Sequence, residues 1–295
     1  MRTTLQALLD SGRPIVADGA MGTMLFALGL QQGDSPELWN VERPDAVRSV
    51  HRGYIEAGAQ VILTNSFGGN RLRLARHDLA DRAAELNQAA ARAARAEADA
   101  APGPVVVAGS MGPTGALLEP LGDLPFDKAV AAFEEQARAL AAGGVDVLWI
   151  ETMSDLEEVR AAVEGARRGA PDLPIVTTMT FDTGGRTMMG VTPEKAAQTL
   201  GGYGPLALGS NCGTGPDELA TAIANMHAAA PEAVLVAKAN AGVPRMVEGQ
   251  AVYAATPEDM AAYALRVRAA GARIIGACCG STPAHVRAIA QALKD

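Results

Sequence analysis

The segment Ile274-Ile275-Gly276-Ala277-Cys278-Cys279-Gly280-Ser281-Thr282-Pro283 combines three signals in one short stretch. It opens on an apolar run typical of a buried strand and continues into two adjacent cysteines. Thr282-Pro283 then places an N-cap hydroxyl before a proline at the first helical position, which marks the start of a helix. The segment therefore predicts one strand-to-helix unit whose connecting loop carries two thiols.

The same alternation recurs along the whole chain of 295 residues. The apolar runs give eight candidate strands, at Pro14–Ala17, Gln60–Thr64, Val105–Ala108, Val145–Ile150, Pro174–Thr178, Leu206–Gly209, Ala233–Ala237 and Arg273–Gly276. Helical patterns separate and follow them, at Asp45–Ala57, Arg71–Ala98, Asp127–Ala142, Asp155–Arg168, Pro193–Leu200, Pro216–Ala229, Pro257–Ala270 and Pro283–Lys294. Strands that alternate with helices favour parallel pairing, because each crossover returns the chain in the same direction.

Eight such units predict an α/β fold, a single (β/α)8 TIM barrel, with an open doubly wound sheet as the alternative. No linker rich in proline, serine and glycine divides the chain, so we expect one domain over residues 1–295. Hydrophobic residues make up 48% of the sequence and aromatic residues only 4%, so alanine, valine and leucine must fill the core.

Charge and hydropathy exclude two classes of partner. The net charge of −8 argues against a nucleic-acid surface, because phosphate binding requires clustered lysine and arginine. No apolar run reaches the roughly 18 residues needed to span a bilayer. The N-terminus lacks the apolar core of a signal peptide. We therefore expect a soluble, cytoplasmic protein that binds neither nucleic acid nor membrane.

The three cysteines lie in two glycine-rich segments, Cys212 in one and Cys278 with Cys279 in the other. One plus two thiolates could occupy three corners of a zinc tetrahedron and leave the fourth free, as in catalytic zinc sites. Thiolate ligands also favour zinc over hard cations such as Mg²⁺. The alternatives are core packing of free cysteines and a disulfide, although the adjacent pair would form a strained bridge. His227 or His285 could add a fourth ligand, but each lies in an alanine-rich helical pattern and is expected on a helix surface.

Polar clusters follow the ends of the predicted strands, where barrel active sites lie. Asp18 and Glu151 each end an apolar run, and buried carboxylates are costly unless paired with a cation. Facing a common mouth they could bind an ammonium group, although either could instead cap a helix or loop. Gly19 would let backbone N–H groups approach a carboxylate closely, and Thr23 could add a hydroxyl donor. Together with a thiolate-seeking metal, these features describe a site for an α-amino acid that bears a thiol.

Seven segments occur in a fixed order: Asp18-Gly19-Ala20-Met21-Gly22-Thr23, Thr64-Asn65-Ser66-Phe67-Gly68-Gly69-Asn70, Gly109-Ser110-Met111-Gly112-Pro113-Thr114-Gly115, Ile150-Glu151-Thr152, Asn211-Cys212-Gly213 with Gly215-Pro216, Asn240-Ala241-Gly242, and Cys278-Cys279-Gly280-Ser281-Thr282-Pro283. This ordered set resembles the homocysteine S-methyltransferase family, most closely the homocysteine-binding module of cobalamin-dependent methionine synthase. The resemblance covers essentially the whole chain, and it implies a (β/α)8 barrel.

The resemblance also implies roles for individual residues. Zn²⁺ would be held by Cys212, Cys278 and Cys279 and would activate the thiol of homocysteine for methylation to methionine. The homocysteine ammonium would bind Asp18 and Glu151. The remaining substrate-binding residues implied are Gly19, Ala20, Thr23, Ser110 and Asn211, of which Asn211 would either orient the metal site or only shape its turn.

The methyl donor is less defined. Gly280 follows the cysteine pair as in methionine synthase, which favours methylcobalamin or a methylated corrinoid as donor, brought by a corrinoid protein or by separate methionine synthase modules. The alternatives are a small onium donor (S-methylmethionine, S-adenosylmethionine or betaine) and a non-catalytic zinc- or thiol-binding subunit. One departure from the family is Ala239, preceded by Lys238, where proline is usual.

Overall fold

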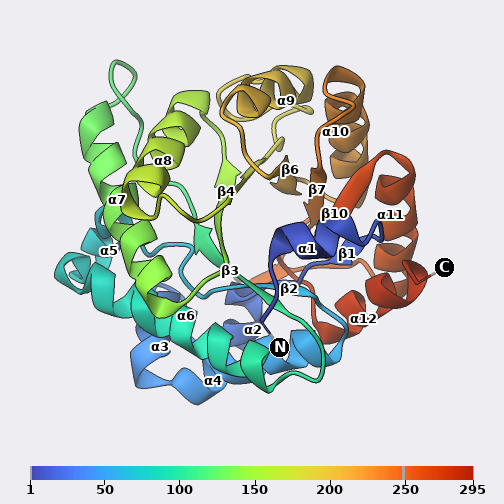
Figure 1. The fold of residues 1–295 in the computed structure, drawn as a ribbon, viewed down its shortest axis with the longest axis horizontal. Coiled ribbons are helices and arrows are strands. Elements are labelled where there is room, and N and C mark those ends of the chain that lie inside the picture. Colours follow the sequence, from blue (N-terminus) through green and yellow to red (C-terminus); the bar gives the residue numbers. More distant parts are fainter. Residues whose placement is uncertain (1, 248–249, 295) are drawn as a thin grey trace.

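The computed structural model describes residues 2–247 and 250–294, and within them a ring of helices surrounds a barrel of parallel strands (Figure 1). The barrel strands are β1 (Ile15–Val16), β2 (Val61–Leu63), β3 (Val106–Met111), β4 (Val147–Met153), β5 (Ile175–Met179), β6 (Ala207–Cys212), β7 (Leu235–Ala239) and β10 (Ala272–Ala277). Their order is β1-β10-β7-β6-β5-β4-β3-β2, and a parallel bridge between Ala17 and Val61 links β1 to β2 at the two edges. The predicted barrel is confirmed, and the open sheet is wrong.

Every predicted strand is present, and several extend beyond the apolar run, three of them by three residues. The strands β3, β4 and β6 continue to Met111, Met153 and Cys212, whereas their apolar runs end earlier in the sequence. Parallel pairing continues past the last apolar residue, as the register of Asn211 with Lys238 on β7 shows. The polar residues that follow the apolar runs therefore belong to the barrel wall.

The helices agree with the predicted pattern except in one region. The principal helices are α4 (Pro44–Glu56), α6 (Ala83–Ala100), α7 (Phe126–Gly143), α8 (Leu156–Gly169), α9 (Pro193–Gly202), α10 (Pro216–Ala229), α11 (Pro257–Ala269) and α12 (Pro283–Ala292). The single helix predicted over Arg71–Ala98 is wrong, because α5 (Arg71–Leu74) is separated from α6 by Asp78 in the left-handed conformation (φ 58°). Such a residue cannot continue a right-handed helix.

Several short elements were not predicted. They are α1 (Leu5–Asp10), α2 (Gly22–Ala27), α3 (Trp39–Glu42) and the hairpin strands β8 (Arg245–Val247) and β9 (Gln250–Val252). Among the helices of the described residues, none has both the length and the apolarity to cross a bilayer.

The interior of the barrel changes from apolar to polar along the strands. An apolar layer that includes Val106, Val147, Trp149, Val236 and Ile274 fills the centre, and the leucines of α1 pack on it. Since side chains alternate across a strand, the residue two positions further on faces the same interior. These next residues are Ser110 after Ala108, Glu151 after Trp149 and Lys238 after Val236. The strand pattern thus sets a polar layer directly above the apolar one.

The close packing of β6 on β7 gives a test of this wall. A Cβ added at Gly209 would lie 2.0 Å from the backbone oxygen of Val236, which cannot move without breaking the sheet. We expect Gly209→Ala to lower the free energy of unfolding by about 1–3 kcal/mol. Gly201→Ala on α9 is the matched control, because a Cβ there meets no atom within 4 Å. Urea unfolding of both variants checks the prediction, and equal stabilities would contradict it.

Candidate metal centre and acceptor pocket

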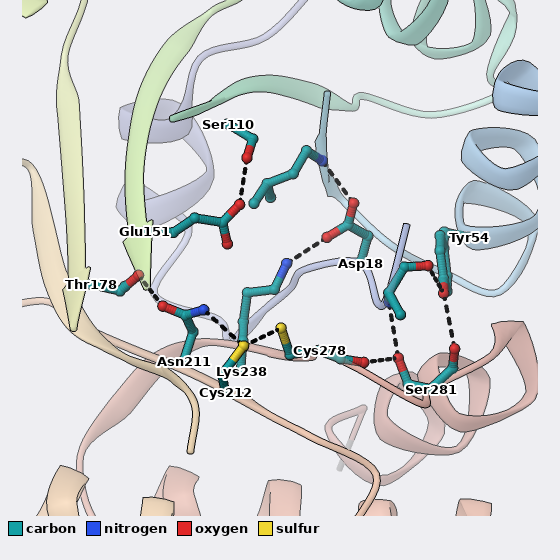
Figure 2. Close-up of polar contacts among 12 residues, drawn as sticks. Asp18, Tyr54, Ser110, Glu151, Thr178, Asn211, Cys212, Lys238, Cys278 and Ser281 are labelled. Carbon is teal, nitrogen blue, oxygen red and sulfur yellow. Dashed lines mark hydrogen bonds and ion pairs between the residues drawn. The ribbon is translucent and has the colours of Figure 1, made fainter. Parts of the chain in front are cut away.

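The three cysteines converge at the carboxyl end of the barrel. Cys212 ends β6, while Cys278 and Cys279 directly follow β10. Their Sγ atoms all lie within 4.8 Å of one another, and the Sγ atoms of Cys212 and Cys278 are 2.9 Å apart (Figure 2). Each of the three residues is partly exposed, so the cluster is accessible to a ligand. Three soft donors at one point fit a tetrahedral zinc site with a free position. The geometry supports the predicted ligand set, whose metal binding stays a prediction.

The chain adopts an unusual backbone conformation to bring Cys212 to this point. Both Cys212 (φ 61°) and Thr152 (φ 60°) have positive φ, which is uncommon for residues other than glycine and costly for a β-branched residue. The Asn211 amide holds both: its oxygen accepts from the Thr152 N–H (2.8 Å) and the Thr178 hydroxyl (2.6 Å). Its nitrogen donates to the Thr152 hydroxyl (2.6 Å) and lies 3.4 Å from Cys212 Sγ. This arrangement supports a positioning role for Asn211, toward the metal site rather than the substrate.

Asn240 ties together the loops that carry the cysteines. Its amide nitrogen donates to the Gly213 carbonyl (2.8 Å), and its oxygen accepts from the Cys279 N–H (3.0 Å). The Ala241 N–H in turn donates to the Cys279 carbonyl (2.9 Å). Asn240 was not among the predicted site residues, although its place at the end of the seventh strand was a signal that could have identified it.

The glycine-rich motif after β1 packs against the last cysteine loop. The Ala20 N–H donates to the Ser281 hydroxyl (3.0 Å), and the Tyr54 hydroxyl donates to the Ala20 carbonyl (2.7 Å). A Cβ on Gly19 would lie 2.4 Å from Ser281 Oγ, so only glycine fits there. The hydroxyl of Thr23 accepts a hydrogen bond from the Gly280 N–H in the last cysteine loop (3.3 Å). These contacts fix the motif beside the cysteines, and the substrate-binding roles of Gly19, Ala20 and Thr23 stay predictions.

The two predicted carboxylates both face the mouth, but Asp18 already has a cation. Lys238 Nζ lies 2.6 Å from Asp18 Oδ1, and the Leu63 N–H donates to Asp18 Oδ2 at 2.7 Å. Asp18 and Lys238 are each only 2% exposed. Burial raises the pKa of Asp18, and the ammonium group opposes that effect. In the sequence, Lys238 was noted only as the residue that precedes Ala239; its alternation with the interior Val236 was the signal that it faces the pocket.

Glu151 lies on the other side of the same space (Figure 2). The Ser110 hydroxyl donates a hydrogen bond to Glu151 Oε1. Ser110 thus lies beside the pocket, and its predicted substrate-binding role stays a prediction. Burial raises the pKa of Glu151 to about 7, with Lys238 opposing and Cys278 reinforcing the shift. Burial lowers the pKa of Lys238, but Asp18, Glu151 and Cys278 together more than offset it, so the pKa is raised and the ammonium form is held.

His285 does not lie on a helix surface as expected. It is largely buried, its Nδ1 is 2.9 Å from the Thr282 hydroxyl, and its Nε2 is 2.9 Å from the Ala255 carbonyl. The ring therefore caps α12, and both nitrogens are engaged away from the cysteines.

Comparison with known proteins places this site in a family. The family model described as homocysteine S-methyltransferase matches residues 15–293. The chain belongs to the homocysteine S-methyltransferase family. The predicted resemblance is confirmed at this level.

Individual relatives of the family agree with that assignment. The chain is 36% identical to methionine synthase of Mycobacterium tuberculosis (strain ATCC 25618 / H37Rv), over 98% of this chain and 25% of that protein. It is 35% identical to methionine synthase of Mycobacterium leprae (strain TN), over 95% of this chain and 24% of that protein. The chain thus spans about a quarter of the length of these curated relatives. The metallated form of the homocysteine methyltransferase MmuM from Escherichia coli superposes with a TM-score of 0.83 and 28% identity, covering 97% of this chain and 99% of that chain.

The raised pKa of Glu151 predicts a pH-dependent stability in the metal-free protein. The carboxyl has an ordinary value of 4.5 when unfolded and about 7 when folded, so its stabilising effect is present below about pH 4.5 and is lost as the pH rises through about 7. We expect the free energy of unfolding of the wild type to fall by about 3 kcal/mol relative to Glu151→Gln across that window. Chelator-treated proteins unfolded in urea at several pH values provide the measurement. The exposed Glu232→Gln variant is the control, and a Glu151→Gln profile parallel to wild type would contradict the assignment.

Proposed function

We propose that this chain transfers a methyl group to the thiol of homocysteine, giving methionine, with Zn²⁺ held by Cys212, Cys278 and Cys279. The observation that carries the proposal is the convergence of these three Sγ atoms within 4.8 Å at the mouth of a barrel of this family. Thiolate donors select zinc, and three protein ligands leave one position for a substrate sulfur. The Escherichia coli relative was solved in a metallated form, which supports metal binding by this chain as well.

Zinc at these residues would hold the acceptor as a thiolate, which is the nucleophilic form of a thiol that otherwise ionises near pH 8.5. The residues of the chain supply position and charge. Asn211 and Asn240 fix the two cysteine loops through the hydrogen bonds described above. Glu151 faces the pocket, and among the described residues only Ser110 donates a hydrogen bond to it, which leaves an oxygen for the substrate ammonium.

The acceptor sulfur then attacks the donor methyl group in line and displaces its carrier. The product is a thioether, which is a poorer metal ligand than a thiolate, and this difference favours product release. Burial of Glu151 near the cysteines keeps water away from the carboxylate that would hold the substrate ammonium, which strengthens their electrostatic interaction.

We propose methylcobalamin or a methylated corrinoid protein, supplied in trans, as the donor. Gly280 after the cysteine pair, as in methionine synthase, is one support. The second is the number of exposed apolar side chains in the segments that follow the barrel strands, where they could pack against a partner protein. Eight of the nine large apolar side chains exposed in the described residues lie, in the sequence, between a barrel strand and the next principal helix: Phe26, Leu28, Val41, Leu117, Leu121, Met188, Val243 and Val252.

The donor proposal predicts the outcome of a panel assay. Zinc-loaded protein is incubated with homocysteine and, separately, with methylcobalamin, S-methylmethionine, S-adenosylmethionine or betaine, and methionine is measured. We expect turnover with methylcobalamin and none with the onium compounds. Turnover with an onium donor alone would support the alternative donor class. Tight homocysteine binding without turnover on any donor, including a methylated corrinoid protein, would instead support a non-catalytic thiol-binding subunit.

The zinc proposal predicts the effect of removing one ligand. Cys278→Ser should bind zinc at least tenfold more weakly and lose methyl transfer, because a serine hydroxyl does not replace a thiolate as a soft ligand. Zinc content by elemental analysis and methionine formation are measured on the same preparation. Ser49→Ala, an exposed change on α4, is the control. Full turnover in a demonstrably zinc-free variant would falsify the proposal.

A further inference from the structure

Lys238 is a lysine built into the wall of the acceptor pocket. It lies on β7, in register with Asn211 of β6 and Gly276 of β10, and its side chain is 2% exposed. Lysine is almost never fully buried unless it is paired. Its ammonium group is 2.6 Å from Asp18 Oδ1 and 6.0 Å from the centroid of the Trp149 ring, which places it inside the barrel mouth.

The ammonium group of Lys238 is surrounded by the anionic groups of the pocket. These are Asp18 at the end of β1, Glu151 on β4 and Cys278 after β10, each of which favours the charged form of the lysine. Figure 2 shows the lysine directed at Asp18, with Glu151 across the same space. One carboxylate that could hold a substrate ammonium is therefore already paired with a cation of the protein.

We propose that Lys238 acts as a built-in substitute for a substrate ammonium, so that the site also methylates short mercapto carboxylates that lack the α-amino group. The inference rests on the proposed function, since it concerns which thiols accept the methyl group at that site. Lys238 is in this view a residue that determines acceptor specificity.

The physical reason is the cost of unpaired buried charge. In a pocket with two carboxylates and no lysine, an acceptor without an ammonium leaves both carboxylates uncompensated, and buried charges without a partner are strongly unfavourable. Here Lys238 compensates Asp18, whose second oxygen accepts from the Leu63 N–H. Glu151 accepts a hydrogen bond from the Ser110 hydroxyl, so it keeps a partner when the acceptor brings no ammonium. The amino group of the acceptor thus has Glu151 as its one carboxylate partner among the two, and its loss costs less than in a pocket without Lys238.

The reaction is the same for either acceptor. The thiol loses its proton to solvent water, the sulfur forms a bond to the donor methyl carbon, and the bond between methyl and carrier breaks. The electron pair of that bond leaves with the carrier, which is a corrinoid cobalt or, for an onium donor, the neutral sulfur or nitrogen. The product from a mercapto carboxylate is its S-methyl thioether.

The test compares homocysteine with 4-mercaptobutyrate, which differs from it only by the missing amino group. Both kcat/KM, with the donor that supports homocysteine turnover, and Kd by calorimetry on zinc-loaded protein are measured. We expect wild type to prefer homocysteine by less than about tenfold. Lys238→Met frees Asp18 for the substrate ammonium and should raise that preference by about 10- to 100-fold. Lys238→Arg retains the charge and should stay close to wild type, as should the control Lys195→Met on α9.

The outcomes separate the two proposals. A wild-type preference for homocysteine above about 1000-fold, or a preference unchanged in Lys238→Met, overturns the role of Lys238. If Lys238→Met does not fold, the double variant Asp18→Asn/Lys238→Met serves instead, because it removes both charges of the ion pair. This double variant should retain the low wild-type preference for homocysteine. A high preference for homocysteine in the double variant overturns the inference. Absence of turnover with both thiols counts against the proposed function, and the calorimetric ratio then decides on Lys238 alone.

Discussion

The alternation of side chains along eight parallel strands is the constraint on which the mouth of this barrel depends. Trp149 and Val236 belong to the apolar interior layer, so Glu151 and Lys238, two residues further along, must face the same interior. A shift of one residue in strand register would turn both charged groups toward the surrounding helices. Glu151 and Lys238 are therefore placed by the same pairing that fixes the core, and no separate loop conformation is needed for these two charges.

Backbone strain at the metal site is offset by a hydrogen-bond network across three strands. Residues with positive φ such as Thr152 and Cys212 cost of the order of 1–3 kcal/mol each. Asn211 bonds to Thr152 on β4 and to Thr178 on β5, and it reaches Cys212 beside it on β6. The strained backbone thus lies at the point where the Cys212 sulfur turns toward the barrel interior. The Asn211 amide that holds this conformation makes its hydrogen bonds to the protein. Strain that is held in this way keeps the cysteine in place before any ligand binds.

Much of this architecture could be predicted from local signals, and the failures have physical causes. The strands, the Thr-Pro starts of helices and the grouping of Cys212 with Cys278 and Cys279 follow from apolar runs and residue types alone. The break at Asp78 was missed because the residues on both sides of it have good helix propensity, and the break is set by packing of Leu74 with Ala83 and Leu86. The ion pair between Asp18 and Lys238 spans 220 positions, so only the closed barrel reveals it.

The buried ion pair has a consequence for how charge is distributed at the mouth. Three cysteinates and one Zn²⁺ would carry a formal charge of −1, and Asp18 and Glu151 add two further carboxylates to the same space. A buried ion pair contributes little net stability compared with apolar residues of similar size, so stability alone does not account for Lys238. Its ammonium group instead supplies positive charge that acts on Asp18, Glu151 and Cys278 together. Lys238 on β7 therefore determines whether the carboxylates of the pocket need a positively charged group on the acceptor.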